Sequence, residues 1–522
     1  MRQGATDGWA TRFGLIMAMA GNAVGLGNFL RFPGKAAPYG GAFMVPYFTV
    51  LVLIGIPLMW MEWTIGRHGG GYGHGTTPGM FHRMWNRRVS KYLGIFGVLL
   101  PAMVGVYYIY IESWSLGYAW QTVTGAYWGK TSNEEMKGVF GAFLGMDGGF
   151  FSFNPSAYFF FLVTLGINVL VFSRGIAGGI EIVAKYCMPV LLVLGVVLTV
   201  RVLTLPPVEE RTVSDGLAQV WRVDDWSVLL KPDIWLAAAG QIFFTLSVGL
   251  GMVHTYASYL RKREDVVLSG LASAGTNELV EVVIGGSIAI PAAVIFFGVT
   301  QTREIAGSGT FFIGFYALPV IFQQMPAGQF FGTLWFLLLF LAGLTSSMAM
   351  FTPLLVFLED ELRLTRRQGV ALISAVVFVF MQPVVLFMHH GLMDELDYWM
   401  GEVGLVLFVA IESVVFSWVF GMDKGWREMH LGADIRLPRV FYYIMKYVTP
   451  SASVIIFLWW CGGSLWGKLT MAGAVPEDKP FLWLARGMIL VVAAFIAWGI
   501  HHAWKTHPKL FEVVEQEEGG EA

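Results

Sequence analysis

The sequence GNAVGLGNFLRFP, at residues 21–33, places two closely spaced glycines inside an apolar stretch that runs from 13 to 37. A glycine in a helix interior costs roughly 1 kcal/mol relative to alanine, so Gly25 and Gly27 allow the backbone to leave helical geometry. The pattern VGLG at 24–27 returns at 248–251, in the sixth apolar stretch of the chain. These two interrupted segments guide the interpretation of the whole sequence.

The composition indicates that both segments lie in a membrane. Of 522 residues, 56% are hydrophobic and 13% are charged, whereas a soluble domain has about 25% charged residues. Apolar runs near or above the roughly 18 residues that cross a bilayer recur along the chain. We predict an all-α integral membrane protein, surrounded by the lipid bilayer, with twelve transmembrane helices at 13–37, 41–66, 92–124, 157–173, 178–202, 233–257, 267–298, 329–358, 369–388, 399–420, 441–467 and 482–504.

The same data disfavour several classes of function. The net charge of −2 gives no reason to expect nucleic acid as a partner, and two cysteines cannot build a disulfide scaffold. The sequence shows no set of nucleophile, base and oxyanion donors and no cluster of metal ligands, so we do not expect an enzyme. The first apolar stretch lacks a small-residue cleavage site and is expected to be retained.

Basic residues predict the orientation. The positive-inside rule places the loops after the second, sixth, eighth and tenth spans in the cytoplasm, together with both termini. The long loops at 125–156, 203–232 and 299–328 then lie outside, in a multi-pass protein of the plasma (inner) membrane. The basic residues of the inner loops are Arg83, Arg87, Arg88, Lys91, Arg261, Lys262, Arg263, Arg363, Arg366, Arg367, Lys424, Arg427, Arg436 and Arg439.

The two glycine interruptions stand five spans apart. Paired interruptions are the best sequence indicator of the binding site of an inverted-repeat transporter, because unwound backbone is tolerated in a membrane only where protein or a cavity surrounds it. The alternative is that the glycines serve only close helix packing. Asn22, Asn28, Thr245 and Ser247 add side-chain oxygens that suit a small hard cation, and freed amides suit an α-carboxylate.

Other polar residues also lie inside predicted spans. Thr345 and Ser346 share a helical face with Ala342, although hydroxyls in membrane helices often bond only to their own backbone. Asn277 and Glu281 are four residues apart, and an intramembrane carboxylate is a functional candidate, with a buried structural acid as the alternative.

Three further acids, Glu62, Glu112 and Glu412, have no cation-ligand cluster around them in sequence, and we expect hydrogen-bonded structural roles for them. Arg31 and Asp397 lie at comparable depth near the outer side, where they could pair.

Four segments resemble the signatures of the neurotransmitter:sodium symporters, and most closely their bacterial leucine-transporter branch. They are residues 21–33, 107–114 (YYIYIESW), 240–247 (GQIFFTLS) and 342–347 (AGLTSS). The resemblance runs from about Trp9 to the twelfth span. It implies a LeuT-type 5+5 inverted repeat with helices 1 and 6 broken, which works by alternating access.

The implied division is a cytoplasmic segment at 1–12, a first repeat at 13–203, an extracellular loop at 204–232, a second repeat at 233–420, two further helices at 421–506 and a cytoplasmic tail at 507–522.

The resemblance also implies two sodium (Na+) sites. The first is completed by the substrate carboxylate, which couples the ion directly to the substrate. Its protein oxygens come from Ala23, Asn28, Thr245 and Asn277. The second clamps span one against span eight, and its oxygens come from Gly21, Val24, Ala342, Thr345 and Ser346.

The implied substrate is an amino acid. Gly25 leaves room for its carboxylate, where monoamine-carrying relatives have an aspartate. The side-chain pocket is mostly apolar, so a hydrophobic amino acid is favoured, and Leu250 and Met350 leave space for aromatic ones. The implied substrate-binding residues are Asn22, Ala23, Gly25, Leu26, Gly27, Val104, Tyr108, Phe244, Thr245, Ser247, Leu250, Ser346 and Met350.

Gates are implied on both sides of the substrate. Tyr108 and Phe244 would form a lid, with Arg31 and Asp397 as the outer gate. The inner gate would use Trp9, Ser258, Tyr259 and Asp360. The chain departs from the family here, because Thr6 and Asp7 stand where an arginine is expected before Trp9. Two alternatives remain open: Arg2 takes the place of that arginine from further away, or the inner gate is weaker.

Glu281 stands where chloride-dependent relatives have a neutral serine, so the resemblance implies that chloride is not needed. The alternatives are a same-fold sodium-coupled carrier of a betaine or amine, and a channel or sensor that uses the ion sites without coupled transport. Whether the protein forms a homodimer also stays open.

Overall fold

The computed structural model describes residues 9, 11–146, 149–308, 311 and 313–508, and in these residues it contains helices but no β-strand. Eleven helical segments of the described chain are long and apolar enough to cross a membrane. They are Phe13–Ala36, Gly40–Gly71, Ser90–Thr124, Pro155–Ser173, Ile176–Leu203, Val267–Gly307, Gly328–Asp360, Arg366–Leu386, Leu392–Met429, Arg439–Gly463 and Lys479–Thr506. The prediction of an all-α membrane protein is confirmed.

Several of these segments consist of more than one helix. The α-helices are α1 (Arg12–Ala23), α2 (Phe32–Ala36), α3 (Met44–Val50), α4 (Ile56–Gly71), α5 (Thr77–Met84), α6 (Ser90–Leu93), α7 (Phe96–Thr124), α8 (Asn133–Leu144), α9 (Pro155–Ser173), α10 (Glu181–Leu203), α11 (Val213–Trp221), α12 (Pro232–Thr245), α13 (Met252–Ala257), α14 (Val267–Glu278), α15 (Gly286–Ser308), α16 (Leu318–Gln324), α17 (Gly328–Asp360), α18 (Arg366–Leu386), α19 (Leu392–Leu396), α20 (Gly404–Val414), α21 (Met422–Met429), α22 (Arg439–Tyr443), α23 (Thr449–Gly463), α24 (Leu465–Leu469) and α25 (Lys479–Thr506).

The sixth predicted span is missing from the eleven because it is broken. α12 ends at Thr245 and α13 begins at Met252, so neither half is long enough to cross a bilayer alone. Between them Ser247, Gly249 and Gly251 have φ values of 57°, 73° and 73°. This left-handed region is unfavourable for residues with a side chain. A Cβ at Gly251 would also lie 2.0 Å from the carbonyl oxygen of Gly97.

The first span is interrupted at the corresponding glycines. α1 ends at Ala23, and Val24 is extended, with φ −83° and ψ 96°. A π-helical turn at Gly27–Arg31 then leads into α2. Both predicted breaks are therefore present.

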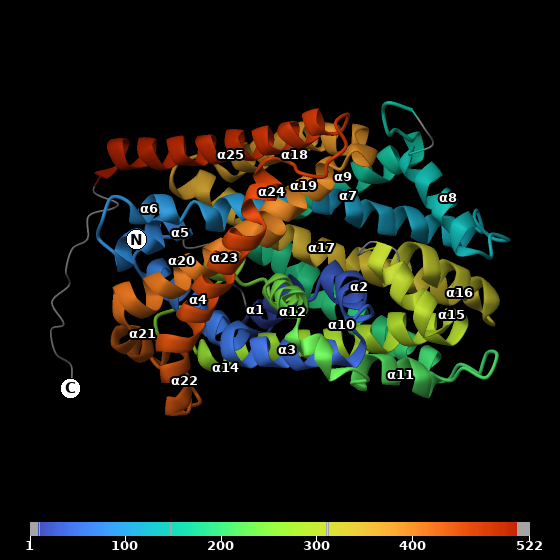
Figure 1. Cartoon of the computed structure of the whole chain (residues 1–522). Coiled ribbons are helices and arrows are strands. Elements are labelled where there is room, and N and C mark those ends of the chain that lie inside the picture. The colour runs from blue at the N-terminus through green and yellow to red at the C-terminus, as the bar shows by residue number, and fades with distance from the viewer. Residues whose placement is uncertain (1–8, 10, 147–148, 309–310, 312, 509–522) are drawn as a thin grey trace.

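The connections gather at two opposite ends of the molecule. In Figure 1, α5, α6 and α21 lie at one end, and α8, α11 and α16 lie at the other. The first group belongs to the loops with basic residues, and the second to the three long loops. These long loops were not expected to contain helices. The seventh span also continues past its predicted end, through a bend at Gly298, where φ is 79°.

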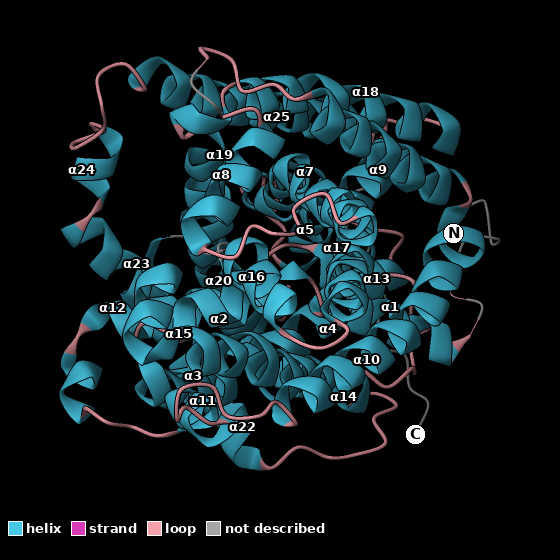
Figure 2. Cartoon of the chain, turned by 90° about the vertical axis from the view of Figure 1, so that its right-hand side faces the viewer, coloured by secondary structure: helices cyan, strands magenta, loops and turns pink. Residues whose placement is uncertain are grey.

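Central and peripheral helices differ in what surrounds them. Seen end-on in Figure 2, α7 and α17 lie in the middle of the bundle, while α18 and α25 run along its edge. In the most apolar window of each span, 89% of the residues of Ser90–Thr124 are buried, but only 17% of those of Lys479–Thr506. Large apolar side chains such as Leu490 and Val491 are exposed on α25. A surface of this kind suits contact with lipid.

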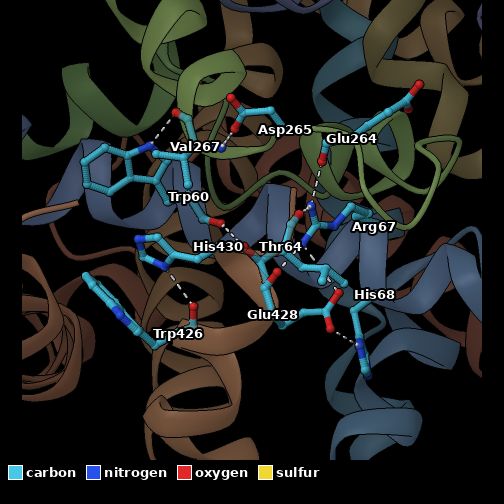
Figure 3. Close-up of polar contacts among 11 residues, drawn as sticks. Trp60, Thr64, Arg67, His68, Glu264, Asp265, Val267, Trp426, Glu428 and His430 are labelled. Carbon is cyan, nitrogen blue, oxygen red and sulfur yellow. Dashed lines mark hydrogen bonds and ion pairs between the residues drawn. The ribbon is translucent and has the colours of Figure 1, made fainter. Parts of the chain in front are cut away.

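A buried arginine ties two connections to α4 at the end that carries α5 and α6. Figure 3 shows Arg67 of α4 aimed at backbone carbonyls from two later loops. Its Nη1 donates to the carbonyl oxygens of Glu264 (2.6 Å) and Leu431 (2.8 Å), and its Nη2 donates to that of Glu428. The side chain of Asp265 accepts hydrogen bonds from the amides of Val267, Leu268 and Asp434. The loops after the sixth and tenth spans are thus held against α4.

Candidate functional site

The two breaks lie against each other in the core. The hydroxyl of Ser247, in the second break, donates to the carbonyl of Asn22, at the end of α1, over 2.8 Å. The Gln241 side chain of α12 donates to the carbonyl of Gly27 over 3.4 Å. Asn22 Oδ1 is buried without a hydrogen-bond partner in the structure. The interrupted segments therefore present backbone and side-chain polar groups to one shared region.

Freed amides of the first break are bonded by neutral side chains. The amide of Gly25 donates to Asn28 Oδ1 over 2.8 Å, and the amide of Leu26 donates to the hydroxyl of Tyr108 over 3.0 Å. A Cβ at Gly25 would lie 2.5 Å from Ser346 Oγ and 2.8 Å from the Tyr108 hydroxyl. Gly25 thus sits in a tight polar cradle of one amide and two hydroxyls, which can bind an anionic group.

The residues expected at the first sodium site form a buried network around Glu281. Asn28 Nδ2 donates to Asn277 Oδ1 over 2.7 Å and to Glu281 Oε2 over 3.1 Å. The Thr245 hydroxyl donates to the carbonyl of Gln241 over 2.9 Å, and Gln241 Nε2 donates to Glu281 Oε1 over 2.9 Å. The amide, hydroxyl and carbonyl oxygens of this network are the ligand type that a hard cation takes. Ala23 ends α1 beside the same break.

The residues expected at the second sodium site lie where α17 crosses α1. Ser346 Oγ donates to the carbonyl of Gly21 over 3.3 Å, and a Cβ at Gly21 would lie 3.1 Å from the Thr345 Cβ. The Thr345 hydroxyl donates back to the carbonyls of Leu341 (3.1 Å) and Ala342 (3.2 Å). The Thr345 hydroxyl therefore bonds to its own helix, as the packing alternative predicted, whereas the Ser346 hydroxyl bonds across to α1. Val24, the last of this set, is fully buried.

The expected side-chain pocket is mostly apolar. Val104, Leu250 and Met350 are buried in the hydrophobic core, and Phe244 is partly exposed. The Phe244 ring lies against the first break, since a Cβ at Gly27 would be 3.1 Å from it.

A charged cluster lies outside this pocket. Arg31 Nη1 is 3.9 Å from Asp397 Oδ1, its Nη2 is 3.4 Å from Glu402 Oε1, and its guanidinium lies 4.4 Å from the centre of the Phe244 ring. The Tyr107 hydroxyl donates to Asp397 over 2.6 Å. A cavity of about 350 Å³ borders this cluster, lined by Arg31, Lys35, Tyr39, Asp233, Leu236, Ala237, Gly240, Tyr398, Glu402, Val403, Val406, Ile456, Phe457, Trp460, Ser464 and Lys468.

At the opposite end, Trp9 packs on the second half of span six. Its Nε1 donates to the carbonyl of Tyr256 over 3.3 Å, and the two rings meet edge to face at 5.2 Å. The Ser258 hydroxyl donates to the Thr255 carbonyl within α13, and Tyr259, the next residue, is half-buried.

Asp360 accepts the amide of Gly75 over 3.1 Å, which ties the end of α17 to the connection after α4. Burial raises the pKa of the neighbouring Glu361 carboxyl to about 8, and repulsion from Asp360 acts in the same direction. The positions of Arg2, Thr6 and Asp7, which bear on the missing arginine, lie outside the described residues.

Sequence reasoning missed three partners. Tyr47 donates to Glu281 and also lies 2.9 Å from Glu278, Gln241 bridges Glu281 to the first break, and Glu402 is closer to Arg31 than Asp397 is. Gln241 and Glu402 are polar residues inside predicted spans, a signal that could have marked them. Nothing in the sequence distinguishes Tyr47 from an ordinary packing aromatic.

Comparison with known proteins gives a consistent result. A profile described as the sodium:neurotransmitter symporter family matches residues 6–138 and 152–462. An uncharacterised sodium-dependent transporter of Methanocaldococcus jannaschii is 28% identical over 465 residues, which cover 87% of this chain and 90% of that protein. The sodium-dependent serotonin transporter of Drosophila melanogaster is 24% identical over 519 residues, covering 89% and 77%. The crystal structure of MhsT in complex with L-phenylalanine matches with a TM-score of 0.75 and 28% identity, covering 87% of this chain and 99% of MhsT.

Proposed function

The chain belongs to the sodium:neurotransmitter symporter family, and we propose that within this family it is a symporter of hydrophobic amino acids, aliphatic to aromatic. Membership makes it a multi-pass, sodium-dependent membrane transporter with the LeuT fold, and not an enzyme. We propose, beyond this, which class of substrate it carries, how many ions move with it and which residues form the gates.

The observation that carries the proposal is the cradle at Gly25. An amino-acid carboxylate fits the Leu26 amide and the hydroxyls of Tyr108 and Ser346, which surround a position without a side chain. An aspartate at position 25 would put its own carboxylate in this place and would favour an amine instead. The apolar Val104, Leu250 and Met350 suit a hydrophobic side chain. The structural neighbour MhsT, solved with L-phenylalanine, supports the same substrate class.

Two sodium ions would move with the substrate. The first would use oxygens of Ala23, Asn28, Thr245 and Asn277 and touch the substrate carboxylate. The second would use Gly21, Val24, Ala342, Thr345 and Ser346, at the contact between α1 and α17. The second site joins α1 of the first repeat to α17 of the second repeat. Its occupancy would therefore stabilise one arrangement of the two repeats over another.

Alternating access would follow from movement between the two repeats, 13–203 and 233–420. We assign Arg31, Asp397 and the rings of Tyr108 and Phe244 to the outer closure, and Trp9, Ser258, Tyr259 and Asp360 to the inner closure. The end that carries the basic loops would face the cytoplasm together with both termini, in the plasma membrane. A homodimer is compatible with this arrangement but is not required by it.

Chloride independence is the second part of the proposal. Glu281 places a carboxylate within 3.1 Å of Asn28, so a negative charge beside the first sodium site is available from the protein itself. We expect Glu281→Ser to transport only when chloride is present, with uptake falling at least tenfold in gluconate. Uptake by Glu281→Ser that is equal in chloride and gluconate would refute this part.

The substrate class is tested by competition. Purified protein in liposomes takes up labelled phenylalanine in the presence of sodium, and each common amino acid, glycine betaine and a panel of monoamines is added in excess. We expect leucine, isoleucine, methionine, tyrosine and tryptophan to compete, and betaine and amines not to compete. Competition by amines alone would overturn the amino-acid assignment.

A further inference from the structure

A second polar cluster lies beside the broken sixth span, and it shares no residue with the candidate sodium sites. It consists of Glu62 of α4, His254 of α13 and Glu412 of α20, and all three side chains are fully buried. His254 Nδ1 is 3.3 Å from Glu62 Oε2, and His254 Nε2 is 3.4 Å from Glu412 Oε2. One imidazole thus stands between two carboxylates, with a different ring nitrogen facing each.

The cluster has more hydrogen-bonding capacity than the protein satisfies. Glu62 Oε2, both His254 nitrogens and both Glu412 oxygens have no hydrogen-bond partner in the structure. A purely structural hydrogen-bonded role was expected for Glu62 and Glu412. Glu62 Oε1 does accept the Gly249 amide, but the contacts of His254 with the two carboxylates are at ion-pair distance without a hydrogen bond. Unpaired ionisable groups are costly inside a protein, so the site is incomplete without a bound species.

The arrangement favours a proton over a metal ion as that species. The three side chains each offer a ligand atom within 4.8 Å of the others, but a metal ion would use only one of the two ring nitrogens. Each nitrogen faces its own carboxylate, at 3.3 and 3.4 Å, which is the arrangement that two N–H donors require. A proton on each ring nitrogen allows His254 to donate to Glu62 and Glu412 at once. A further proton on one carboxylate makes the whole cluster neutral, which a buried site requires.

No other ion pair reaches these three side chains within the described residues. The groups that face them are the Gly249 amide and the Phe408 ring of α20, whose centre is 6.2 Å from that of His254. Arg67, the next charged side chain along α4, is bound to Glu428 and to loop carbonyls. The charge of the cluster is therefore set by its own protons.

The cluster is attached directly to the break. Glu62 Oε1 accepts the amide of Gly249, one of the left-handed residues between α12 and α13, over 2.5 Å. His254 lies on the short helix that follows, two residues before Tyr256, on which Trp9 packs. Movement of α13 against α4 and α20 would separate the imidazole from one or both carboxylates, and opening of the end where Trp9 packs would admit water to them.

We propose that Glu62, His254 and Glu412 form a proton-binding site whose occupancy changes as the second half of span six moves. This inference rests on the proposed alternating-access function. When the Trp9 end opens, the N–H or O–H bond of the bound proton breaks and the proton passes to water on that side. The base left behind takes a proton back before α13 returns.

The first test reads the site without any transported solute. Infrared spectra of the purified full-length protein are recorded over a pH series, and the C=O band of buried carboxylic acids is followed. We expect a titrating band that disappears in Glu412→Gln and shifts in His254→Gln, but not in the matched control His430→Gln. His430 is held outside the spans by the Trp426 carbonyl and the Leu437 amide. No band that depends on Glu412 or Glu62 would overturn the proposal.

The second test links the site to transport. Liposomes are loaded with a pH dye, and the protons exchanged per labelled phenylalanine are measured. His254→Gln should at least halve this ratio while sodium-driven uptake persists. In Glu281→Gln, the protons that the Glu62–His254–Glu412 cluster contributes should still be exchanged. An unchanged ratio in His254→Gln and Glu412→Gln, or stoichiometric zinc bound to the wild-type protein and lost in His254→Gln, would overturn the proposal. Absence of uptake in the wild type would instead count against the proposed function.

Discussion

The two broken spans differ in the chemistry that satisfies their freed backbone. In the first break, the amides of Gly25 and Leu26 are bonded by the neutral groups of Asn28 and Tyr108. In the second, the amide of Gly249 is bonded by the carboxylate of Glu62. Neutral groups can exchange an internal hydrogen bond for an ion or a substrate without leaving a charged side chain unpaired, whereas a carboxylate needs a cation or proton beside it. We therefore expect both breaks to contribute to cargo binding, and the side of the second break that faces Glu62 to respond to protons as well.

The largest expected effect comes from removing cation ligands beside the first break. Asn28→Ala and Thr345→Ala should each weaken sodium-dependent substrate binding by about 100-fold or more, about 2.7 kcal/mol, because each removes an oxygen from a site closed to water. Thr333→Ala is the control for Thr345, since its hydroxyl also bonds to its own helix, α17, but is exposed. Scintillation-proximity binding at several sodium concentrations measures the effect. Unchanged sodium dependence in both variants would show that the ion sites are misplaced.

A methyl group in the second break should act mainly on stability. Gly251→Ala forces a side chain into a backbone with φ 73° and within 2.0 Å of the Gly97 carbonyl oxygen, so we expect a loss of about 2 kcal/mol. Thermal unfolding in detergent is the measurement. A variant as stable as the wild type would mean that this turn is not rigid.

The same change in the first break should act mainly on binding. Gly25→Ala places a Cβ 2.5 Å from Ser346 Oγ and fills the cradle, so we expect about tenfold weaker substrate binding, about 1.4 kcal/mol. Gly275→Ala is the matched control, since nothing lies within 4 Å of its added Cβ. If Gly25→Ala lowered stability more than Gly251→Ala and left binding intact, the assignment of binding to the first break and of stability to the second would be contradicted.

The smallest effect is expected at the charged cluster outside the first break. Arg31 lies 3.4 Å from Glu402 and 3.9 Å from Asp397, which are partly exposed. Pairs of this kind contribute about 0–1 kcal/mol. Glu402→Gln and Asp397→Asn should therefore each speed substrate release only about threefold, as measured by dissociation of labelled phenylalanine. A tenfold effect of Asp397→Asn with none from Glu402→Gln would assign the closure to Asp397 alone.

The breaks and the spans could be predicted from sequence because they depend on local properties. Glycines at 25, 27, 249 and 251 interrupt otherwise apolar helices, and this pattern is visible without knowledge of the neighbours. The sixth span fails the length criterion for that same reason. The helices α8, α11 and α16 in the long loops were not expected, since short amphipathic segments resemble ordinary loops in sequence.

The partners within the sites were harder to predict because they depend on which helix faces meet. Glu62 and Glu412 looked like isolated structural acids, and only the packing of α13 between α4 and α20 brings His254 to both. Tyr47 likewise gains its role from a contact with Glu281 on a distant span. Resemblance to the family supplied the expected ligand sets, but it did not indicate the histidine.

The central claim is coupled transport of a hydrophobic amino acid with sodium. The most direct measurement is uptake of labelled phenylalanine into liposomes that contain the purified protein, with and without an inward sodium gradient. We expect phenylalanine to accumulate above its external concentration only when the gradient is present. This accumulation should collapse when sodium is equal on both sides, and it should be abolished in Asn28→Ala. Phenylalanine accumulation that ignores sodium, or a sodium current that flows without any substrate, would contradict it.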